Sequence, residues 1–408
     1  MPSLAKVSVL VVSWNGREHL AACLPALLAE RTPGVTVEIL VFDNGSTDGT
    51  AELLRDRHPE VIVVPSPVNL GFAAANNRLA GLASGDALWL LNNDARPRAG
   101  CLAALVDAYR AADDDVAAVA GRLVDWEGAR LDFGSGILIF DGHALAVDQG
   151  RPLAGARSPA AGQELLFGCG ANLLVRRDSF LAAGGFDERY FAYFEDVDLG
   201  WRLWAGGERV VAAPEAIAFH RQGASSSRLG NRWRGALFER NAFWTMDKNL
   251  ESDLRESLLP AILMTYLARI EAMLGREAPE FARSFGAPPR AGGAQPIAPG
   301  LLARLVGAPA KGTDPGLRLE DDQLLAQLGA LGGLRAGLDE IEAERAALAR
   351  RRRRSDVEIF DRFPLWIVPT YPGDESWLAS PTFESWLPRG LRFARARLAE
   401  VIALDDAR

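Results

Sequence analysis

Leu90-Leu91-Asn92-Asn93-Asp94 closes an apolar run that begins at Ala87 and stops abruptly at three polar side chains. A short apolar run with such a boundary is typical of a strand buried on both faces of a parallel sheet. Helix-like stretches at 19–30 and 100–112 alternate with similar runs. The runs lie at residues 7–12, 38–42, 61–64 and 116–120. The alternation predicts an α/β fold with a mostly parallel sheet flanked by helices.

The size and charge of the chain limit its organisation and its partners. A chain of 408 residues exceeds the usual size of one domain, so we expect one large domain with a smaller appendage. The net charge of −8 gives no general electrostatic reason to bind nucleic acid or an anionic membrane. We therefore expect no nucleic-acid partner.

The cysteines and the apolar stretches favour a cytoplasmic protein. Cys23, Cys101 and Cys169 are odd in number and scattered, which fits buried thiols in a reducing compartment. The chain start lacks the cationic and apolar segments of a secretion signal. The stretch 258–268 is shorter than the roughly 20 apolar residues that span a bilayer. It predicts a buried or interfacial helix, so peripheral contact with the inner face of a membrane stays open.

Composition divides the chain into four predicted regions. The main α/β domain covers 1–250 and a helical extension covers 251–285. A linker rich in proline and glycine follows at 286–318, and a helical, aromatic-rich region of unknown role covers 319–408.

One amphipathic helix is predicted within 320–350. Leucines and isoleucines recur there at spacings of three and four, from Leu324 to Ile341, and the helix runs into the arginines 350–354. Its apolar face needs a partner surface, and a second copy of the chain is one candidate. The arginine run is typical of a solvated helix end. Contact with the phosphate groups of a lipid or glycan carrier is the alternative.

Two polar clusters follow the first two predicted strands. In open α/β sheets the ligand binds outside the carboxyl ends of the strands, so Ser13-Trp14-Asn15 and the segment 43–48 are candidate ligand contacts. Asp43 could accept hydrogen bonds from a pyrimidine N–H or a ribose hydroxyl. An equally good interpretation is a tight turn in which Ser46 or Thr47 caps the helix that begins near Thr50.

The next two clusters are candidates for phosphate and metal binding. In Asn69-Leu70-Gly71, which leads to Asn76, glycine permits close backbone approach and the following helix can present free N–H groups to phosphate. The cluster 92–94 places one carboxylate and two amides at the ligand edge of the sheet. Oxygen ligands completed by substrate phosphates suit Mg²⁺ or Mn²⁺, and a simple turn is the alternative.

The segment 186–202 contains adjacent carboxylates among aromatic side chains. Because such carboxylates are costly unless used or neutralised, a general base is expected there. The alternative is that Glu195 and Asp196 complement a helix dipole while Asp198 pairs with Arg202, and both can hold together. His220 ends an apolar stretch, where a structural role and a metal-ligand role are equally supported.

Taken in order, these clusters resemble the family 2 glycosyltransferases with the GT-A fold, in particular the bacterial rhamnosyltransferase-like group. The resemblance covers about residues 7–250. Its specificity lies in six ordered motifs: Ser13-Trp14-Asn15-Gly16, Asp43-Asn44-Gly45-Ser46-Thr47-Asp48, Asn69-Leu70-Gly71-Phe72, Leu91-Asn92-Asn93-Asp94, Gly184-Gly185-Phe186-Asp187 and Glu195-Asp196-Val197-Asp198-Leu199.

The resemblance implies roles for these residues. Asp196 would be the catalytic base and Glu195 would help position the acceptor. A divalent metal, Mg²⁺ or Mn²⁺, would rest on Asp94 and His220, because Asn92 stands where many relatives have the first aspartate of a paired motif. The donor nucleotide would contact Ser13, Trp14, Asn15, Asp43, Asn44, Ser46, Asn69, Gly71, Asn76, Asn92 and Asn93. The loop Gly168, Cys169, Gly170 and Ala171 would shape the sugar and acceptor pocket.

The implied activity is inverting transfer of one sugar. A base would remove the acceptor proton while that oxygen displaces the nucleotide diphosphate in a single step. Rhamnose from a nucleotide diphosphate donor is the first expected sugar, and a glycan or lipid-linked glycan is the expected acceptor, in cell-wall or polysaccharide biosynthesis. The alternatives are a sugar nucleotidyltransferase, which usually begins with a glycine-rich basic loop, and a non-catalytic glycan-binding relative.

Overall fold

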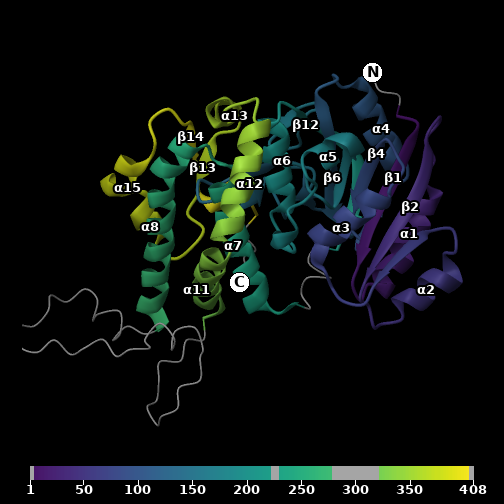
Figure 1. Cartoon of the computed structure of the whole chain (residues 1–408), viewed down its shortest axis with the longest axis horizontal. Helices are drawn as coiled ribbons and strands as arrows, with labels where there is room; N and C mark the ends of the chain where they lie inside the picture. Colours follow the sequence, from purple (N-terminus) through teal and green to yellow (C-terminus); the bar gives the residue numbers. More distant parts are fainter. Residues whose placement is uncertain (1–3, 222–228, 278–320, 404–408) are drawn as a thin grey trace, which may run out of the picture.

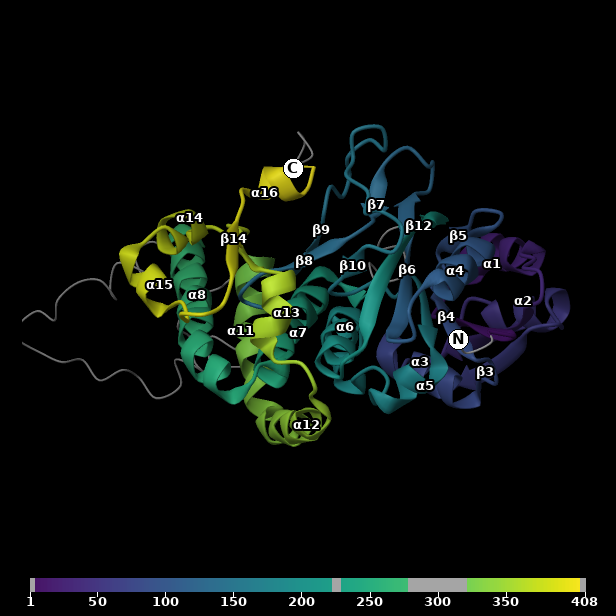
Figure 2. The same ribbon diagram turned by 90° about the horizontal axis from the view of Figure 1, so that it is seen from above.

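The computed structural model describes residues 4–221, 229–277 and 321–403. An α/β sheet with helices on both faces forms one side of the molecule, and the helices of the C-terminal region form the other (Figures 1 and 2). The predicted linker at 286–318 lies outside the described residues, so the division into four regions stays a prediction.

The central sheet has ten strands and is mostly parallel. Its main path runs β10-β12-β6-β11-β4-β1-β2-β3, while β5 pairs with β12 and β7 with β6. Strands β1, β2, β3 and β4 are parallel, and β11 is antiparallel to both β4 and β6. The bounds are β1 Lys6–Ser13, β2 Thr36–Asn44, β3 Ile62–Ser66, β4 Ala87–Leu91, β5 Ala95–Pro97, β6 Val116–Asp125, β7 Leu131–Phe133, β10 Glu164–Leu165, β11 Asn172–Arg176 and β12 Arg209–His220. All five strands expected from the apolar runs are present.

Helices cover both faces of this sheet. In Figure 2, α1 and α4 lie on one face, and α3, α5 and α6 lie on the other. Strand β4 is buried along its whole length between these layers, which explains its unbroken apolar sequence. The bounds are α1 Arg17–Ala29, α2 Thr50–Arg57, α3 Gly71–Leu82, α4 Cys101–Ala111, α5 Arg177–Ala182, the 3₁₀ turn η1 Glu188–Tyr190 and α6 Glu195–Ala205.

The rest of the chain packs beside α6. A small hairpin, β8 and β9, leads from the sheet toward the C-terminal region. There Ile139 bridges to Trp366 of β13, which pairs in parallel with β14. The bounds are β8 Gly136–Leu138, β9 Ala144–Ala146, α7 Asn231–Asn249, α8 Ser252–Glu277, α11 Asp322–Ala336, α12 Leu338–Arg351, α13 Asp356–Arg362, β13 Leu365–Ile367, α14 Asp374–Leu378, α15 Pro381–Trp386, β14 Phe393–Arg395 and α16 Leu398–Val401.

The prediction of one amphipathic helix within 320–350 is wrong, because α11 and α12 are two helices that meet at Gly337. A Cβ at this position would come within 2.7 Å of the Trp244 ring on α7. The close approach fixes a glycine there, and glycine weakens a helix. The partner surface for α11 lies in the same chain, on α7 and α8. A second copy of the chain is therefore not needed to cover it.

The arginine run after α12 is not a freely solvated helix end. Arg351 donates to the carbonyl of Ala182 at the end of α5, and Arg352 donates to that of Asn249 at the end of α7. Arg354 donates to the carbonyls of Trp204 and Glu208 around the end of α6. Cationic side chains stabilise the unpaired carbonyls at helix C-termini, so the run fastens α12 to three helices.

A buried ionic cluster joins α8 to the rest of the molecule. Arg269 is fully buried and contacts Asp141 at 2.7 Å, in the turn between β8 and β9, and Asp374 at 2.8 Å, at the start of α14. Helix α8 is long and apolar enough to cross a membrane, although the apolar run 258–268 is too short to predict this. Length and composition alone are weak evidence for a membrane span. Helices in the core of soluble proteins can be equally long and apolar, and 44% of the most apolar window of α8 is buried inside the protein.

Candidate functional site

A cavity of about 610 Å³ opens at the carboxyl ends of β1, β2 and β4. It brings together residues that the sequence placed in separate motifs. Those that line it are Trp14, Asn44, Asn69, Gly71, Asn92, Asn93, Asp94, Cys169, Gly170, Ala171, Glu195, Asp196 and His220. Ser13, Asn15, Asp43, Ser46, Asn76 and Gly168 are not among its lining residues.

The side chain of Ser13 lies beneath the cavity rather than in its wall. Ser13 is fully buried, and its hydroxyl accepts a hydrogen bond of 3.1 Å from the Asn93 amide. A Cβ at Gly16 would come within 2.1 Å of the same amide, so glycine leaves room for it. Ser13 and Gly16 therefore position Asn93, which does line the cavity.

The turns after β1 and β2 are tied to each other. The backbone N–H of Asn15 donates to the Ser46 hydroxyl at 2.9 Å, and the N–H of Thr47 donates to the Asn15 side chain at 2.7 Å. Asp43 accepts from the N–H of Ser46 at 3.1 Å. The expected capping by Ser46 or Thr47 does not occur, because Gly49 is the N-cap of α2 and has no side chain to accept a hydrogen bond. The N–H of Thr50 donates to the Asp48 carboxylate at 3.1 Å instead. These polar residues set the shape of the cavity rim.

The first turn of α3 is not a free phosphate site, contrary to the interpretation of the glycine motif. The N–H groups of Phe72 and Ala73 both donate to the carbonyl of Phe191, at 2.6 and 3.2 Å. The N–H of Gly71 is taken by the Asn69 side chain at 2.9 Å. Asn76 is buried and donates to the carbonyl of Phe72, so it stabilises α3 itself. Asn69 and Gly71 contribute side-chain and backbone surface to the cavity instead.

Asp94 and His220 meet at one end of the cavity. The Asp94 carboxylate lies 3.3 Å from Nε2 of His220, and Nδ1 of that histidine lies 2.6 Å from the carboxylate of Asp132. Burial alone would lower the pKa of His220, but its hydrogen bonds to Asp132 and Asp94 outweigh burial and raise the pKa to about 10. Asp132 orients the ring so that Nε2 faces Asp94, as outer carboxylates do for metal-binding histidines.

Sequence reasoning missed Asp132. It lies in β7, a strand of three residues, and 88 positions separate it from His220. No spacing rule connects residues so far apart, so only the pairing of β7 with β6 brings the carboxylate to the histidine.

Glu195 and Asp196 also line the cavity, at the start of helix α6. One oxygen of Asp196 accepts from the N–H of Gly170 at 3.0 Å, and the other accepts from the N–H of Val197 at 2.8 Å. Burial raises the pKa of Asp196, and these hydrogen bonds offset part of that rise. Burial, followed by the charge of Asp196, raises the pKa of Glu195 well above its usual range. Both carboxyl groups are therefore better proton acceptors than ordinary surface carboxylates.

Helix α6 is fixed by a buried ionic network behind these carboxylates. Asp198 pairs with Arg202 at 2.7 Å and with Lys248 of α7 at 2.6 Å. Burial raises the pKa of Asp198, but the two cations outweigh burial and hold the pKa below its usual range. The expected pairing of Asp198 with Arg202 is confirmed. Asp196, two positions earlier in the same helix, lines the cavity.

A strained loop forms the cavity wall just before Glu195. Phe191, Tyr193 and Phe194 all have positive φ, between 64° and 73°, which non-glycine residues rarely adopt. The buried side-chain amide of Asn241 donates to the carbonyls of Tyr190, Ala192 and Tyr193 at 2.8 to 2.9 Å. Asn241 therefore holds the loop in place. Sequence reasoning missed Asn241, because asparagine within a helix has no characteristic spacing.

The glycine-rich loop 168–171 lies against the same carboxylates. A Cβ at Gly170 would lie 3.9 Å from that of Asp196, and one at Gly168 would come within 2.6 Å of Ala120. Gly168 is thus required by packing on β6, whereas a Cβ at Gly170 would make only ordinary contacts, so the role of residue 170 rests on its backbone N–H, which donates to Asp196. Cys23 and Cys101 are buried as expected, whereas Cys169 lines the cavity.

The chain is similar to several known proteins. Residues 8–182 match the model of the family described as glycosyl transferase family 2. An N-acetylglucosaminyl-diphospho-decaprenol L-rhamnosyltransferase of Mycobacterium tuberculosis is 36% identical over 246 residues, covering 54% of this chain and 77% of that protein. The succinoglycan biosynthesis protein ExoA of Rhizobium meliloti is 30% identical, covering 50% of this chain and 59% of that protein. Among solved structures, GalNAc-T7 with UDP, GalNAc and Mn²⁺ matches with a TM-score of 0.49 and 15% identity, covering 64% of this chain and 52% of that one.

Proposed function

The chain belongs to family 2 of the glycosyltransferases, and we propose that it transfers L-rhamnose from a nucleoside diphosphate donor to a hydroxyl of a lipid-linked N-acetylglucosamine, with inversion at the anomeric carbon. The observation that carries the proposal is a single cavity lined both by Asp196 and by Asp94 with His220. Inverting transfer needs a base for the acceptor at one end and stabilisation of the leaving diphosphate at the other.

Asp196 is the proposed base. Its carboxylate takes the proton from the acceptor hydroxyl while that oxygen attacks the anomeric carbon, and the bond from that carbon to the nucleoside diphosphate breaks. Two backbone N–H groups fix the carboxylate, so its free lone pairs point in a defined direction. Glu195 is buried, and one of its oxygens has no hydrogen-bond partner among the described residues. We assign it a positioning role toward the acceptor.

The Asp94 end suits a divalent metal such as Mg²⁺ or Mn²⁺. Within residues 4–221, 229–277 and 321–403, no cluster of three or more His, Cys, Asp or Glu residues could hold a metal ion. One carboxylate and one oriented imidazole, which would release its Nε2 proton on binding, fit a metal that takes its remaining ligands from the donor diphosphate and water. When bound, the metal would offset the charge on the departing diphosphate.

The donor and acceptor assignments rest on relatedness. The name of the mycobacterial relative specifies an L-rhamnosyl group and a diphospho-decaprenol-linked N-acetylglucosamine. The aromatic side chains Phe191, Tyr193 and Phe238 in the wall near Asp196 give a surface on which a sugar ring can stack. A cytoplasmic location with contact to the membrane that holds the acceptor completes the proposal, supported by three unpaired cysteines.

The test is a transfer assay with the full chain, Mn²⁺ and a short-chain analogue of the lipid-linked acceptor. Donors are compared by mass spectrometry of the product: thymidine diphosphate rhamnose, and UDP-glucose and GDP-mannose as matched alternatives. We expect a rhamnosyl product and at least tenfold slower reaction with the other two donors. Faster transfer of glucose or mannose would overturn the donor assignment, and absence of transfer to N-acetylglucosamine would overturn the acceptor assignment.

A further inference from the structure

A second cavity, of about 470 Å³, lies away from the catalytic one, and six of its 13 lining residues are cationic. The two cavities share no lining residue. The second lies at the C-terminal end of α6, whereas Asp196 lies at the N-terminal end, and the 11 residues of this helix span about 16 Å. Its cationic lining residues are Arg202, Lys248, Arg350, Arg351, Arg352 and Arg353, and its two carboxylates are Glu208 and Glu344.

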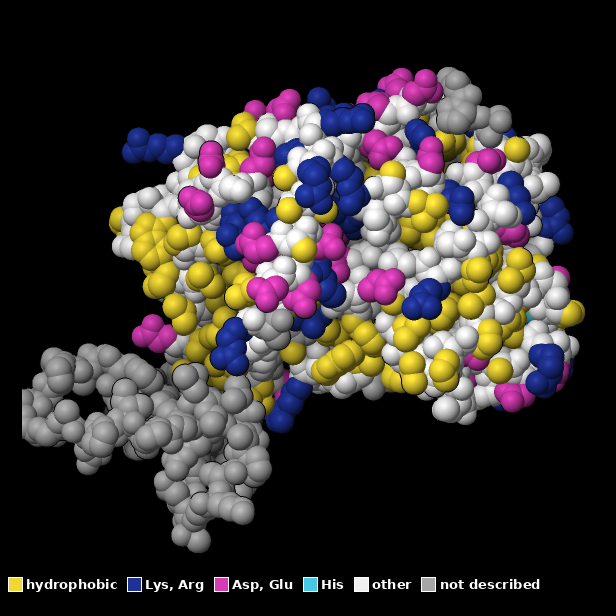
Figure 3. All heavy atoms as spheres, in the orientation of Figure 1, with side chains coloured by type: hydrophobic (Ala, Val, Ile, Leu, Met, Phe, Trp, Pro, Cys, Tyr) yellow, Lys and Arg dark blue, Asp and Glu magenta, His cyan; other side chains and the backbone are white. Residues whose placement is uncertain are grey.

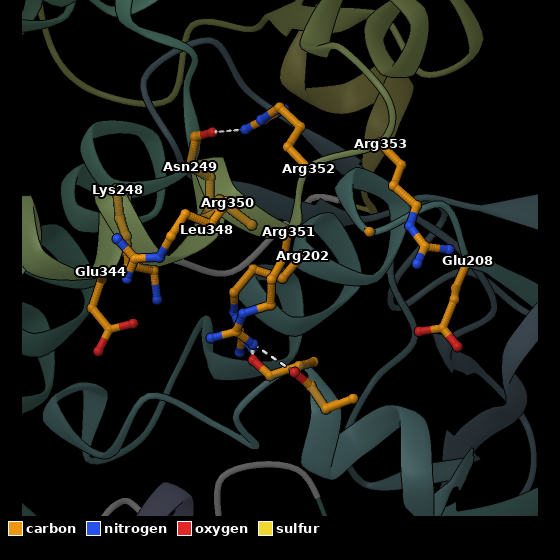
Figure 4. A pocket seen from close by; sticks show the side chains of 13 residues that line it. Arg202, Glu208, Lys248, Asn249, Glu344, Leu348, Arg350, Arg351, Arg352 and Arg353 are labelled. Carbon is orange, nitrogen blue, oxygen red and sulfur yellow. Dashed lines mark hydrogen bonds between the residues drawn. The ribbon is translucent and has the colours of Figure 1, made fainter.

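The cations around this cavity differ in whether they are already neutralised. Arg202 and Lys248 are paired with Asp198, and Arg352 is paired with Asp356 at 2.7 Å. Figure 4 shows Arg351 beside Arg202, and Arg350 beside Lys248 and Glu344. Arg353 lies on the other side of the cavity, toward Glu208. The guanidinium groups of Arg350 and Arg353 have neither an ion pair nor a hydrogen bond within the described parts of the chain.

Helix capping explains only part of this cluster. Arg351, Arg352 and Arg354 each donate to carbonyls at or beside the ends of helices, and so have a structural reason to be there. Arg350 and Arg353 have no such role, yet both are exposed and line the same hollow. Figure 3 shows Lys and Arg side chains gathered on this face where α12 leads into α13. Like charges held together without partners repel each other, and an anion removes that cost.

The chemistry of the lining identifies the anion. Guanidinium groups bind phosphate oxygens through paired N–H donors. No lining residue is aromatic, and the uncharged ones are Ala182, Ala183, Gly206, Asn249 and Leu348. A nucleobase would therefore find no ring to stack on, whereas a phosphate or diphosphate group would be held by its charge.

We propose that the cavity between α5, α6, α7 and the end of α12 binds a phosphate or diphosphate group, with Arg350 and Arg353 as its specific contacts. The group comes either from a lipid head group or from a free phosphate compound. The site is separate from the donor site, so its occupancy does not depend on the transfer reaction.

Calorimetric titration of the full chain with inorganic pyrophosphate tests the proposal. The titration contains a chelator, which removes any metal that could attract pyrophosphate to the catalytic cavity. Without a metal, the four carboxylates that line that cavity, Asp94, Asp132, Glu195 and Asp196, repel the anion. We expect the double variant Arg350→Gln/Arg353→Gln to bind pyrophosphate at least tenfold more weakly than the wild type. The control, Arg335→Gln/Arg389→Gln, removes two exposed arginines outside the cavity and should keep wild-type affinity.

A vesicle arm separates the two sources. If the wild type sediments with phosphatidylglycerol vesicles but not with phosphatidylcholine vesicles, and the double variant sediments with neither, the phosphate group comes from a lipid head group. A difference confined to pyrophosphate would support a free phosphate compound. Equal binding of both probes by the double variant and the wild type would overturn the proposal, and circular dichroism checks that all variants are folded.

Discussion

Replacement of Asn241 by leucine should slow transfer without unfolding the protein, because its side-chain amide holds the strained loop before Glu195 and Asp196. The amide donates to three carbonyls of the loop. The amide has two N–H groups, which are shared among these three carbonyls, and each hydrogen bond contributes about 1 kcal/mol net, so Asn241→Leu removes about 2 kcal/mol. The three positive φ angles store a similar amount, about 1 kcal/mol each.

The magnitude of the rate effect follows from this balance. The net value already includes the water that replaces the lost donor, so the loop loses about 2 kcal/mol of stabilisation. The competent loop would then be populated about 30-fold less, and kcat should fall by about that factor. Thermal unfolding should show a smaller change than the rate, since the loop can relax without disturbing the sheet.

The assay is nucleotide diphosphate release under saturating donor and acceptor, beside urea unfolding of the same samples. Gln327→Leu is the matched control, because Gln327 is also a fully buried amide in a helix, but its side chain has no hydrogen-bond partner among the described residues. It should retain wild-type kcat. A kcat for Asn241→Leu within threefold of wild type would refute the reasoning that the loop must be held.

Three further predictions concern proton transfer, the metal and stability. Burial raises the pKa of Asp196, and the base must be ionised to act, so in a pH–rate profile kcat/KM should begin to fall on the acidic side at a pH above the ordinary pKa range of aspartate. A fall that begins only within that ordinary range would contradict this prediction. Asp132→Asn should weaken activation by Mn²⁺ about 10-fold to 100-fold in a metal titration, because the ring of His220 loses its charged orienting partner. An unchanged titration would argue against a role of His220 in metal binding. Arg269→Met should lower the free energy of unfolding by about 3–5 kcal/mol, because it leaves Asp141 and Asp374 without their shared cation. Urea unfolding measures this free energy, and a loss below about 1 kcal/mol would contradict the prediction.

The sheet was predictable from the sequence because its strands are short apolar runs with sharp polar ends. Strand β4 is buried on both faces, so its pattern leaves little choice, and the polar residues after it had to lie at the ligand edge. The cavity residues Asn92, Asn93 and Asp94 were found on this basis. Family membership then excluded the nucleotidyltransferase alternative.

Long-range and backbone effects were not predictable. Asp132 reaches His220 only through the pairing of two strands, and the N–H groups of α3 are consumed by a carbonyl about 120 positions later in the chain. The break at Gly337 depends on the Trp244 ring, which no helical periodicity can reveal. Tertiary contacts, rather than local propensity, decided each of these features.

The most direct test of the account is the turnover of Asp196→Asn, measured as nucleotide diphosphate release with donor, acceptor and Mn²⁺. The substitution keeps the size of the side chain and one acceptor oxygen but removes the ability to take a proton. We predict that kcat falls by about 10²-fold to 10⁴-fold, the usual contribution of a general base, while donor affinity stays within threefold of wild type. A kcat within tenfold of wild type would contradict the assignment of Asp196 as the base and, with it, the proposed mechanism.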